Sequence, residues 1–108
     1  MTPGDVWIID LGTPIGVESA FRRPALIVGS PLMRGPLAFV CPLTTTMRDY
    51  PWRVEFESSP SSGLSRTSYV QVEHLRSISS SRGVARLGRI DVAGWHRVRS
   101  VLRMLLDL

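Results

Sequence analysis

Short hydrophobic segments separated by glycine, proline and serine run along most of the chain and predict a protein built mainly from β-strands. Residues 4–11 (GDVWIIDL) alternate between two faces, as the residues of a strand do. Pro24 should begin its strand, because proline cannot donate a hydrogen bond to a neighbouring strand. The other expected strands are residues 24–30, 37–45, 52–57, 67–79 and 84–90. The expected loops are residues 12–21, 31–36 and 58–66, the last of them a flexible turn.

The last segment, residues 91–108, has the spacing of a helix. Asp91 is a candidate N-cap, and Gly94 weakens the first turn. The apolar stripe, which we expect to pack on the sheet, consists of Trp95, Val98, Leu102 and Leu105. The whole pattern predicts a mainly β fold with a C-terminal helix, curled into a small barrel or sheet and forming a single domain over residues 1–108.

Composition narrows the class of protein further. The 108 residues, 44% of them hydrophobic, suffice for one core. No apolar run reaches the length of a membrane span and the start of the chain lacks a secretion signal, so we expect no membrane partner. A single cysteine, Cys41, rules out an internal disulfide and fits a reducing compartment. With two histidines, His74 and His96, the chain has no metal-ligand spacing, so no metal or cofactor is expected.

The basic charge of the chain indicates which class of ligand it could bind. The formal net charge is +4, and all thirteen basic residues are arginine. A coding bias toward arginine explains this equally well. The chemical alternative is that arginine binds phosphate through two hydrogen bonds at once, whereas lysine acts as a point charge. A small basic domain is therefore a candidate for binding nucleic acid.

Three clusters carry candidate chemistry. Arg22 and Arg23 precede Pro24, which favours extended backbone at residue 23, so this guanidinium can be held toward a phosphate. Residues 41–46 (CPLTTT) end an apolar run in three hydroxyl groups that could donate to phosphate oxygens. Because consecutive strands often pair, Arg23 and Thr44 could lie on one rim. Each cluster also has an ordinary interpretation, as solvated surface arginines or as threonines that cap a loop.

The third cluster is residues 72–77 (VEHLRS), which place Glu73 and His74 side by side. In a strand these two side chains would point to opposite faces, and an ordinary exposed strand remains the alternative. Glu18 is a loop carboxylate that could pair with an arginine or be solvated. A further set of arginines could extend a phosphate-binding face or could be surface charges: Arg48, Arg53, Arg82, Arg86 and Arg89.

The missing motifs limit the reaction. The chain has no phosphate-binding glycine loop, no nucleophile elbow and no carboxylate cluster for magnesium. Phosphodiester chemistry should then be independent of metal. RNA supplies its own nucleophile, the 2′-OH, so the protein needs only positioned acids, bases and charge stabilisers. DNA lacks that group.

The sequence resembles the MazF/PemK family of toxins from toxin–antitoxin systems. The resemblance covers nearly the whole chain, and each of its segments alone would be a weak signal. The matching segments are GDVWIIDL (4–11), PIGVES (14–19), RRPALIV (22–28), CPLTT (41–45), VEHLRSI (72–78) and the final LLDL. The resemblance implies a small SH3-like barrel of the CcdB/PemK type. It also implies a cytoplasmic homodimer that cuts single-stranded RNA at specific sequences without metal, leaving 2′,3′-cyclic phosphate and 5′-hydroxyl ends, and that is neutralised by a cognate, MazE-like antitoxin.

The resemblance also assigns roles to residues. It makes Arg23 the stabiliser of the scissile phosphate, Thr44 a hydroxyl donor and Glu73 a candidate general base. The residues expected to bind RNA are Glu18, Ser19, Arg22, Thr45, Arg48, Gln71 and His74. Ser19 and His74 stand where many members carry glutamines that touch bases, and Phe21 stands where glycine is common. One branch pairs its carboxylate with an arginine two residues earlier, where this chain has Gln71.

Two other functions stay open from the sequence. A sister family that shares the barrel acts on DNA gyrase, and such a toxin would bind through the C-terminal helix. A non-catalytic SH3-like module would bind RNA or peptide and form no product. The cut sequence cannot be taken from other members, because the base-contacting positions differ.

Overall fold

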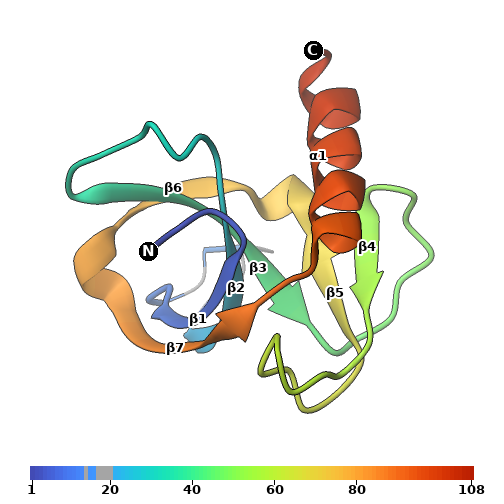
Figure 1. The fold of residues 1–108 in the computed structure, drawn as a ribbon, viewed down its shortest axis with the longest axis horizontal. Helices are drawn as coiled ribbons and strands as arrows, with labels where there is room; N and C mark the ends of the chain where they lie inside the picture. Colours follow the sequence, from blue (N-terminus) through green and yellow to red (C-terminus); the bar gives the residue numbers. More distant parts are fainter. Residues whose placement is uncertain (14, 17–20) are drawn as a thin grey trace.

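The computed structural model describes residues 1–13, 15–16 and 21–108; Glu18 and Ser19 lie outside these residues. Seven strands and one α-helix form its framework (Figure 1). Their bounds are β1 (Asp5–Asp10), β2 (Arg22–Val28), β3 (Leu37–Thr44), β4 (Arg53–Phe56), β5 (Ser68–Gln71), β6 (Arg76–Ser79), β7 (Gly83–Arg89) and α1 (Val92–Leu106). The prediction of a mainly β fold with a C-terminal helix is confirmed.

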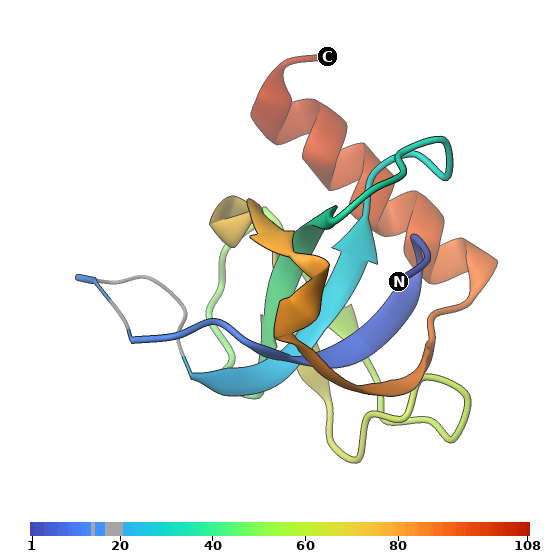
Figure 2. The same cartoon turned by 90° about the vertical axis from the view of Figure 1, so that its left-hand side faces the viewer.

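The strands pair in the order β4-β5-β3-β2-β1-β7, and all pairings are antiparallel. Strand β3 bends between two parts of the sheet. Its first half pairs with β6, and Leu43 and Thr44 at its end pair with β5. This sharing curls the sheet, so α1 can lie against one side of it while its C-terminal end projects beyond the strands (Figures 1 and 2).

Strand β2 is buried on both of its faces, as its unbroken apolar run predicts. Leu26 and Val28 belong to a core between the sheet and α1. Cys41 and Phe56 of the sheet and Val98 of α1 are part of the same core. Alternate residues of β2, including Ala25 and Ile27, enter a second core on the opposite face of the sheet. Burying both faces fixes the pairing of β2, because a slip by one residue would exchange the two sets.

Strand β2 begins two residues earlier than the sequence predicts, so Pro24 is its third residue. Pro24 pairs with Ile8 of β1, whereas the pairing with β3 starts only at Ala25, opposite Pro42. Proline is tolerated here because β2 has a neighbouring strand on only one side at this position. Arg22 and Arg23 are therefore part of the sheet and not of the preceding loop.

Residues 67–79 are not the one strand that the sequence predicts. Strand β5 ends at Gln71, a 3-10 turn covers Val72–His74, and β6 begins at Arg76. This turn lets β5 and β6 pair with different halves of β3. Glu73 and His74 therefore do not have the alternating directions of strand residues.

Helix α1 starts as the sequence predicts, since Asp91 Oδ1 accepts a hydrogen bond from the backbone N–H of Gly94 at 2.7 Å. Gly94 has a second role, because a Cβ at this position would overlap the ring of Phe56. Trp95, Leu102 and the unexpected Val101 pack against the core, and Val98 is part of it. Leu105 was expected in the same stripe but is 39% exposed, where the helix extends past the sheet.

One carboxylate joins the first and last strands. Asp5 of β1 accepts hydrogen bonds from Arg86 Nη2 at 3.3 Å and Arg89 Nη1 at 2.9 Å, both from β7. Burial would raise the pKa of Asp5, but the bonds from Arg86, from the backbone of Thr2 and from Arg89 outweigh it and lower the pKa. We call this group, Asp5 with Arg86 and Arg89, the Asp5 clamp.

The serine-rich segment 58–66 is held against β7. Ser59 and Leu64 bridge across it, and the backbone N–H of Arg89 donates to the carbonyl of Ser61 at 2.8 Å. Gly63 and Gly88 allow the close approach, because a Cβ at either would overlap the facing backbone. These contacts hold a segment for which composition alone suggests a flexible turn.

Candidate functional site

Arg23 and Thr44 line one hollow at an end of the sheet. The pairing of β2 with β3 ends at Ala25 and Pro42, and Arg23 and Thr44, each two residues beyond it on its own strand, line the same hollow. The hollow has a volume of about 390 Å³, and we call it the Arg23–Thr44 hollow. It is lined by Phe21, Arg22, Arg23, Pro24, Leu43, Thr44, Thr45 and Ser68. Two guanidinium groups and three hydroxyl groups thus share one small concavity.

Thr44 has a hydroxyl group with both a structural role and a free proton to donate. Its Oγ1 accepts a hydrogen bond from the backbone N–H of Thr46 at 3.1 Å, which turns the chain out of β3. An accepting hydroxyl keeps its own O–H for another partner. Thr44 can therefore cap the loop and, with the same hydroxyl group, donate a hydrogen bond to a phosphate oxygen. Thr45, the next residue, is exposed beside it.

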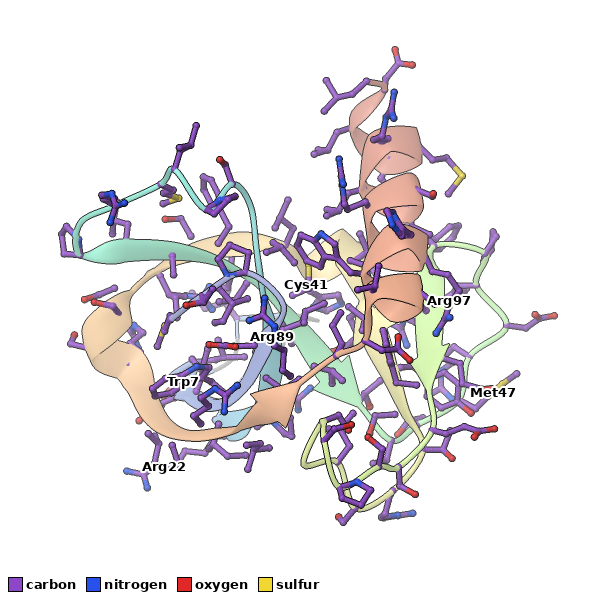
Figure 3. The ribbon with its side chains drawn as sticks, in the orientation of Figure 1. Trp7, Arg22, Cys41, Met47, Arg89 and Arg97 are labelled. Carbon is purple, nitrogen blue, oxygen red and sulfur yellow. The ribbon has the colours of Figure 1, made fainter. Side chains whose placement is uncertain are left out.

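The two arginines differ in their surroundings. Arg22 is exposed, and its Nε lies 4.0 Å from Asp10 Oδ2, which makes a weak surface ion pair. Its side chain points outward from the sheet (Figure 3). Arg23 is half-buried, opposite Ile9 of β1. Burial restricts the side chain, so Arg23 is the better placed of the two to hold a phosphate in one geometry.

Phe21 adds an aromatic ring to the wall of the hollow. Its φ of 59° lies in the left-handed region, which favours glycine, the residue that the sequence resemblance leads us to expect here. Its backbone N–H donates to the carbonyl of Gly12 at 2.6 Å, and its own carbonyl accepts from Leu11 at 2.9 Å. The side chain is 64% exposed. The sequence identifies this residue only as a departure from the family.

Glu73 forms a second cluster, away from the hollow. Arg53 Nε and Nη2 both donate to Glu73 Oε2, at 3.0 and 2.8 Å. The Arg53 guanidinium also lies over the ring of Tyr50, which stacks on Trp52 with ring centroids 4.9 Å apart. Burial would raise the pKa of Glu73, but the hydrogen bonds from Arg53 outweigh this and lower it.

Arg53 is a candidate site residue whose partner the sequence does not reveal. It pairs in register with Gln71, the position where one branch of the family has its arginine. The neighbouring strand β4 thus supplies a guanidinium at a position where β5 has none. Only the pairing of β4 with β5 shows this, since twenty positions separate Arg53 from Glu73 in the sequence.

The remaining predicted residues that the structure describes do not gather at the hollow, and the other two, Glu18 and Ser19, lie outside the described part. Gln71 is buried, 7% exposed, and His74 is half-buried beside Glu73. Arg48 is exposed in the loop after β3, with Nη1 donating to the carbonyl of Met47 at 3.3 Å. None of these, nor Glu73, lines the Arg23–Thr44 hollow.

The other proposed phosphate-binding arginines have structural partners. Arg86 and Arg89 belong to the Asp5 clamp, and Figure 3 shows Arg89 at its place beside β1. Arg82 Nη1 donates to the carbonyl of Asp10 at 3.3 Å. These contacts support the surface and structural interpretation for this set.

Two larger concavities lie elsewhere. One, of about 860 Å³, lies between β4, the serine segment and α1. Its wall carries three carboxylates against two arginines, so it fits a phosphate less well than the Arg23–Thr44 hollow; these residues are Glu55, Glu57, Asp91, Arg53 and Arg97. The other, of about 630 Å³, runs along the C-terminal half of α1 and is mostly apolar, with Phe39, Trp95 and Leu102 in its wall. The Arg23–Thr44 hollow is the smaller site, but its chemistry fits an anion.

Within residues 1–13, 15–16 and 21–108, no three histidine, cysteine, aspartate or glutamate side chains gather as metal ligands would. A membrane crossing would need a longer and more apolar helix than the described part of the chain contains.

Comparisons with known proteins agree with the fold. A family described as "PemK-like, MazF-like toxin of type II toxin-antitoxin system" matches residues 2–106. The chain is 29% identical to endoribonuclease MazF9 of Mycobacterium tuberculosis (strain ATCC 25618 / H37Rv), over 100% of this chain and 98% of that protein.

Solved structures from Deinococcus radiodurans are also similar. One crystal structure of MazF (Form-I) has a TM-score of 0.85 and 27% identity, covering 100% of this chain and 97% of that chain. A crystal structure of MazE–MazF (Form-II) has a TM-score of 0.75 and 27% identity, covering 100% of this chain and 96% of that one.

Proposed function

The chain belongs to the PemK-like, MazF-like family of toxins of type II toxin–antitoxin systems, and from this premise we propose that it is a sequence-specific endoribonuclease. It cuts single-stranded RNA without metal, acts in the cytoplasm and works as a single domain over residues 1–108. The relative MazF9, named an endoribonuclease, supports the activity. The observation that carries the proposal is the shared position of Arg23 and Thr44 in one hollow.

The reaction is a transfer within the RNA. The ribose 2′-OH loses its proton as its oxygen bonds to the adjacent phosphorus, the bond from phosphorus to the 5′-oxygen breaks, and the 5′-oxygen takes a proton from water. The products are a 2′,3′-cyclic phosphate and a 5′-hydroxyl. Arg23 stabilises the negative charge that builds on the phosphorus-bound oxygens. Thr44 donates its hydroxyl to one non-bridging oxygen. We assign Arg23 an electrostatic role, because a guanidinium holds its protons too tightly to act as an acid at neutral pH.

Glu73 has a different role in this proposal from the one expected. The described lining of the hollow holds no carboxylate or imidazole, and Glu73 lies beyond the end of β5. Its carboxylate binds Arg53 through two hydrogen bonds. We therefore assign Glu73 to the positioning of Arg53. The proton of the 2′-OH then leaves to solvent or to a group outside the described lining.

The proposed RNA path begins at the hollow. Arg22 and Thr45 contact the phosphates next to the scissile one, because they line the same wall. Arg48 and His74 contact RNA farther along, together with Glu18 and Ser19, which precede β2 in the sequence. We assign no RNA contact to Gln71, because it is only 7% exposed. An extended chain of phosphates suits this arrangement of cations and hydroxyl groups.

Two protein partners complete the proposal. The first is a MazE-like antitoxin, supported by the MazE–MazF structure of the relative. A basic site that holds a polyanion can also hold an acidic peptide. The second is another copy of this chain. The apolar groove along α1, where Leu106 and Leu108 are 52% and 81% exposed, supports a homodimer.

Incubation of the purified protein with end-labelled RNA in EDTA tests the function. We expect fragments with 5′-hydroxyl and cyclic phosphate ends, and no cleavage of a DNA strand of equal sequence, which has no 2′-OH. Mapping 5′-hydroxyl ends in total RNA would reveal the recognised sequence. Saturable RNA binding without product would instead identify a non-catalytic binding module. Inhibition of purified gyrase would identify a toxin that acts on DNA gyrase.

A further inference from the structure

Phe21 combines three features that its role in the fold does not explain. It is the one residue besides Asp107, in the described part of the chain, that has a positive φ without being glycine. It exposes 64% of its surface. It also lines the Arg23–Thr44 hollow. An exposed aromatic ring on a strained backbone, at the wall of a candidate site, calls for a functional explanation.

The fold itself would be served better by glycine. Glycine adopts φ near +60° freely, whereas an aromatic side chain is disfavoured there. The backbone bonds that Phe21 makes with Leu11 and Gly12 do not involve its side chain. Because the ring is largely exposed, it contributes little to the core. Strained residues of this kind are concentrated at functional sites.

The neighbours of the ring indicate the ligand. Arg22, Arg23, Thr44 and Thr45 surround the same hollow and can hold a phosphate. Proteins that bind single-stranded RNA combine such cations with aromatic rings, on which unpaired bases stack. An acidic peptide would use the cations, but its carboxylates gain nothing from an exposed aromatic ring beside them. The combination favours a nucleotide.

We propose that Phe21 is a base-stacking residue, on whose ring rests the nucleobase adjacent to the phosphodiester held by Arg23 and Thr44. The inference rests on the proposed function, since it places this base within the same RNA-binding site. Phe21 then contributes to the affinity for RNA and to the placement of the phosphate. Stacking tolerates every base, so its contribution does not depend on the recognised sequence.

Phe21→Gly tests the proposal, because the same substitution relieves the backbone and removes the ring. The probe is a randomised pool of single-stranded 2′-O-methyl RNA, which has no free 2′-OH and is not cut. Binding is measured by fluorescence anisotropy and stability by thermal unfolding. We expect F21G to bind RNA about tenfold more weakly, while its melting temperature stays equal or rises. Phe21→Trp should restore or strengthen binding, and Val92→Ala, an exposed site on α1, should change neither property.

Several results would overturn the proposal. F21G could bind the pool as tightly as the parent, or F21W could bind as weakly as F21G. Loss of affinity for an acidic antitoxin peptide with RNA binding intact would assign Phe21 to a protein contact instead. The cleavage assay on unmodified RNA separates this from the proposed function: a parent that binds the pool but cuts nothing contradicts the nuclease activity alone. A parent that does not bind the pool contradicts both.

Discussion

Arg53 donates two hydrogen bonds to Glu73, and both end on the same carboxylate oxygen. The arginine comes from β4 and the glutamate from the turn after β5, so the pair fastens that turn to the edge of the sheet. Its side chains are only 10% and 25% exposed, which makes it stronger than an ordinary surface ion pair. Arg53 pairs in register with Gln71, so the pair places a guanidinium beside the position where the resemblance leads us to expect an arginine.

Glu73→Gln should weaken the fold by about 1–2 kcal/mol at pH 7, because the amide loses the charge that Arg53 binds. The folded state lowers the pKa of Glu73 below its ordinary value of 4.5. Its stabilisation is therefore complete above pH 4.5 and disappears as the pH falls through the lowered pKa. Urea unfolding at a series of pH values should show the two proteins converging in acid.

Glu57→Gln, an exposed carboxylate after β4, provides the control and should leave the stability at pH 7 nearly unchanged. The same Glu73→Gln protein tests the assignment of roles. If it folds and binds 2′-O-methyl RNA as the parent does but no longer cuts unmodified RNA, Glu73 is the general base after all.

Arg23→Lys should reduce cleavage about 100-fold, because lysine keeps the charge but loses the planar pair of donors that stabilises the phosphate. Single-turnover cleavage in EDTA measures the effect, and thermal unfolding should show the fold intact. Arg34→Lys, in the exposed loop between β2 and β3, is the matched control. Cleavage by the Arg23→Lys protein at the parental rate would make Arg23 an ordinary surface charge.

Gly94→Ala should lower stability by about 1–3 kcal/mol, because the new methyl group would overlap the Phe56 ring. The sign is opposite to the usual effect, since alanine in a helix is favoured over glycine by about 1 kcal/mol. Urea unfolding measures the change, with Ser100→Ala on the exposed side of α1 as the control. A more stable Gly94→Ala protein would show that α1 can shift away from β4.

Cys41 should resist thiol reagents in the folded protein. It is fully buried at the centre of the sheet (Figure 3), and burial, with the negative charge of Glu73 as a second cause, raises the pKa of its thiol to about 12. The reactive thiolate is therefore almost absent at pH 8. Labelling by a disulfide reagent should follow the rate of unfolding and become rapid in urea. Complete labelling within seconds in native buffer would contradict the described packing.

The sequence predicts well those features that depend on neighbouring residues. The apolar run of β2 indicates a strand buried on both faces, and the succession of β2 and β3 suffices to place Arg23 near Thr44. The composition of residues 67–79 does not reveal the turn at Val72–His74, because a turn of three residues leaves the strand-like pattern intact. The partner of Glu73 depends on which strands pair, and periodicity carries no information about that.

The Asp5 clamp bears on the order in which the sheet forms. Sequence separations of 81 and 84 residues lie between Asp5 and its partners Arg86 and Arg89. Strand β1 finds β2 nearby in the sequence, whereas β7 is distant, and contacts so distant in sequence form slowly. We therefore expect the docking of β7 onto β1 to be a late step in folding, and the clamp to hold that last pairing in place.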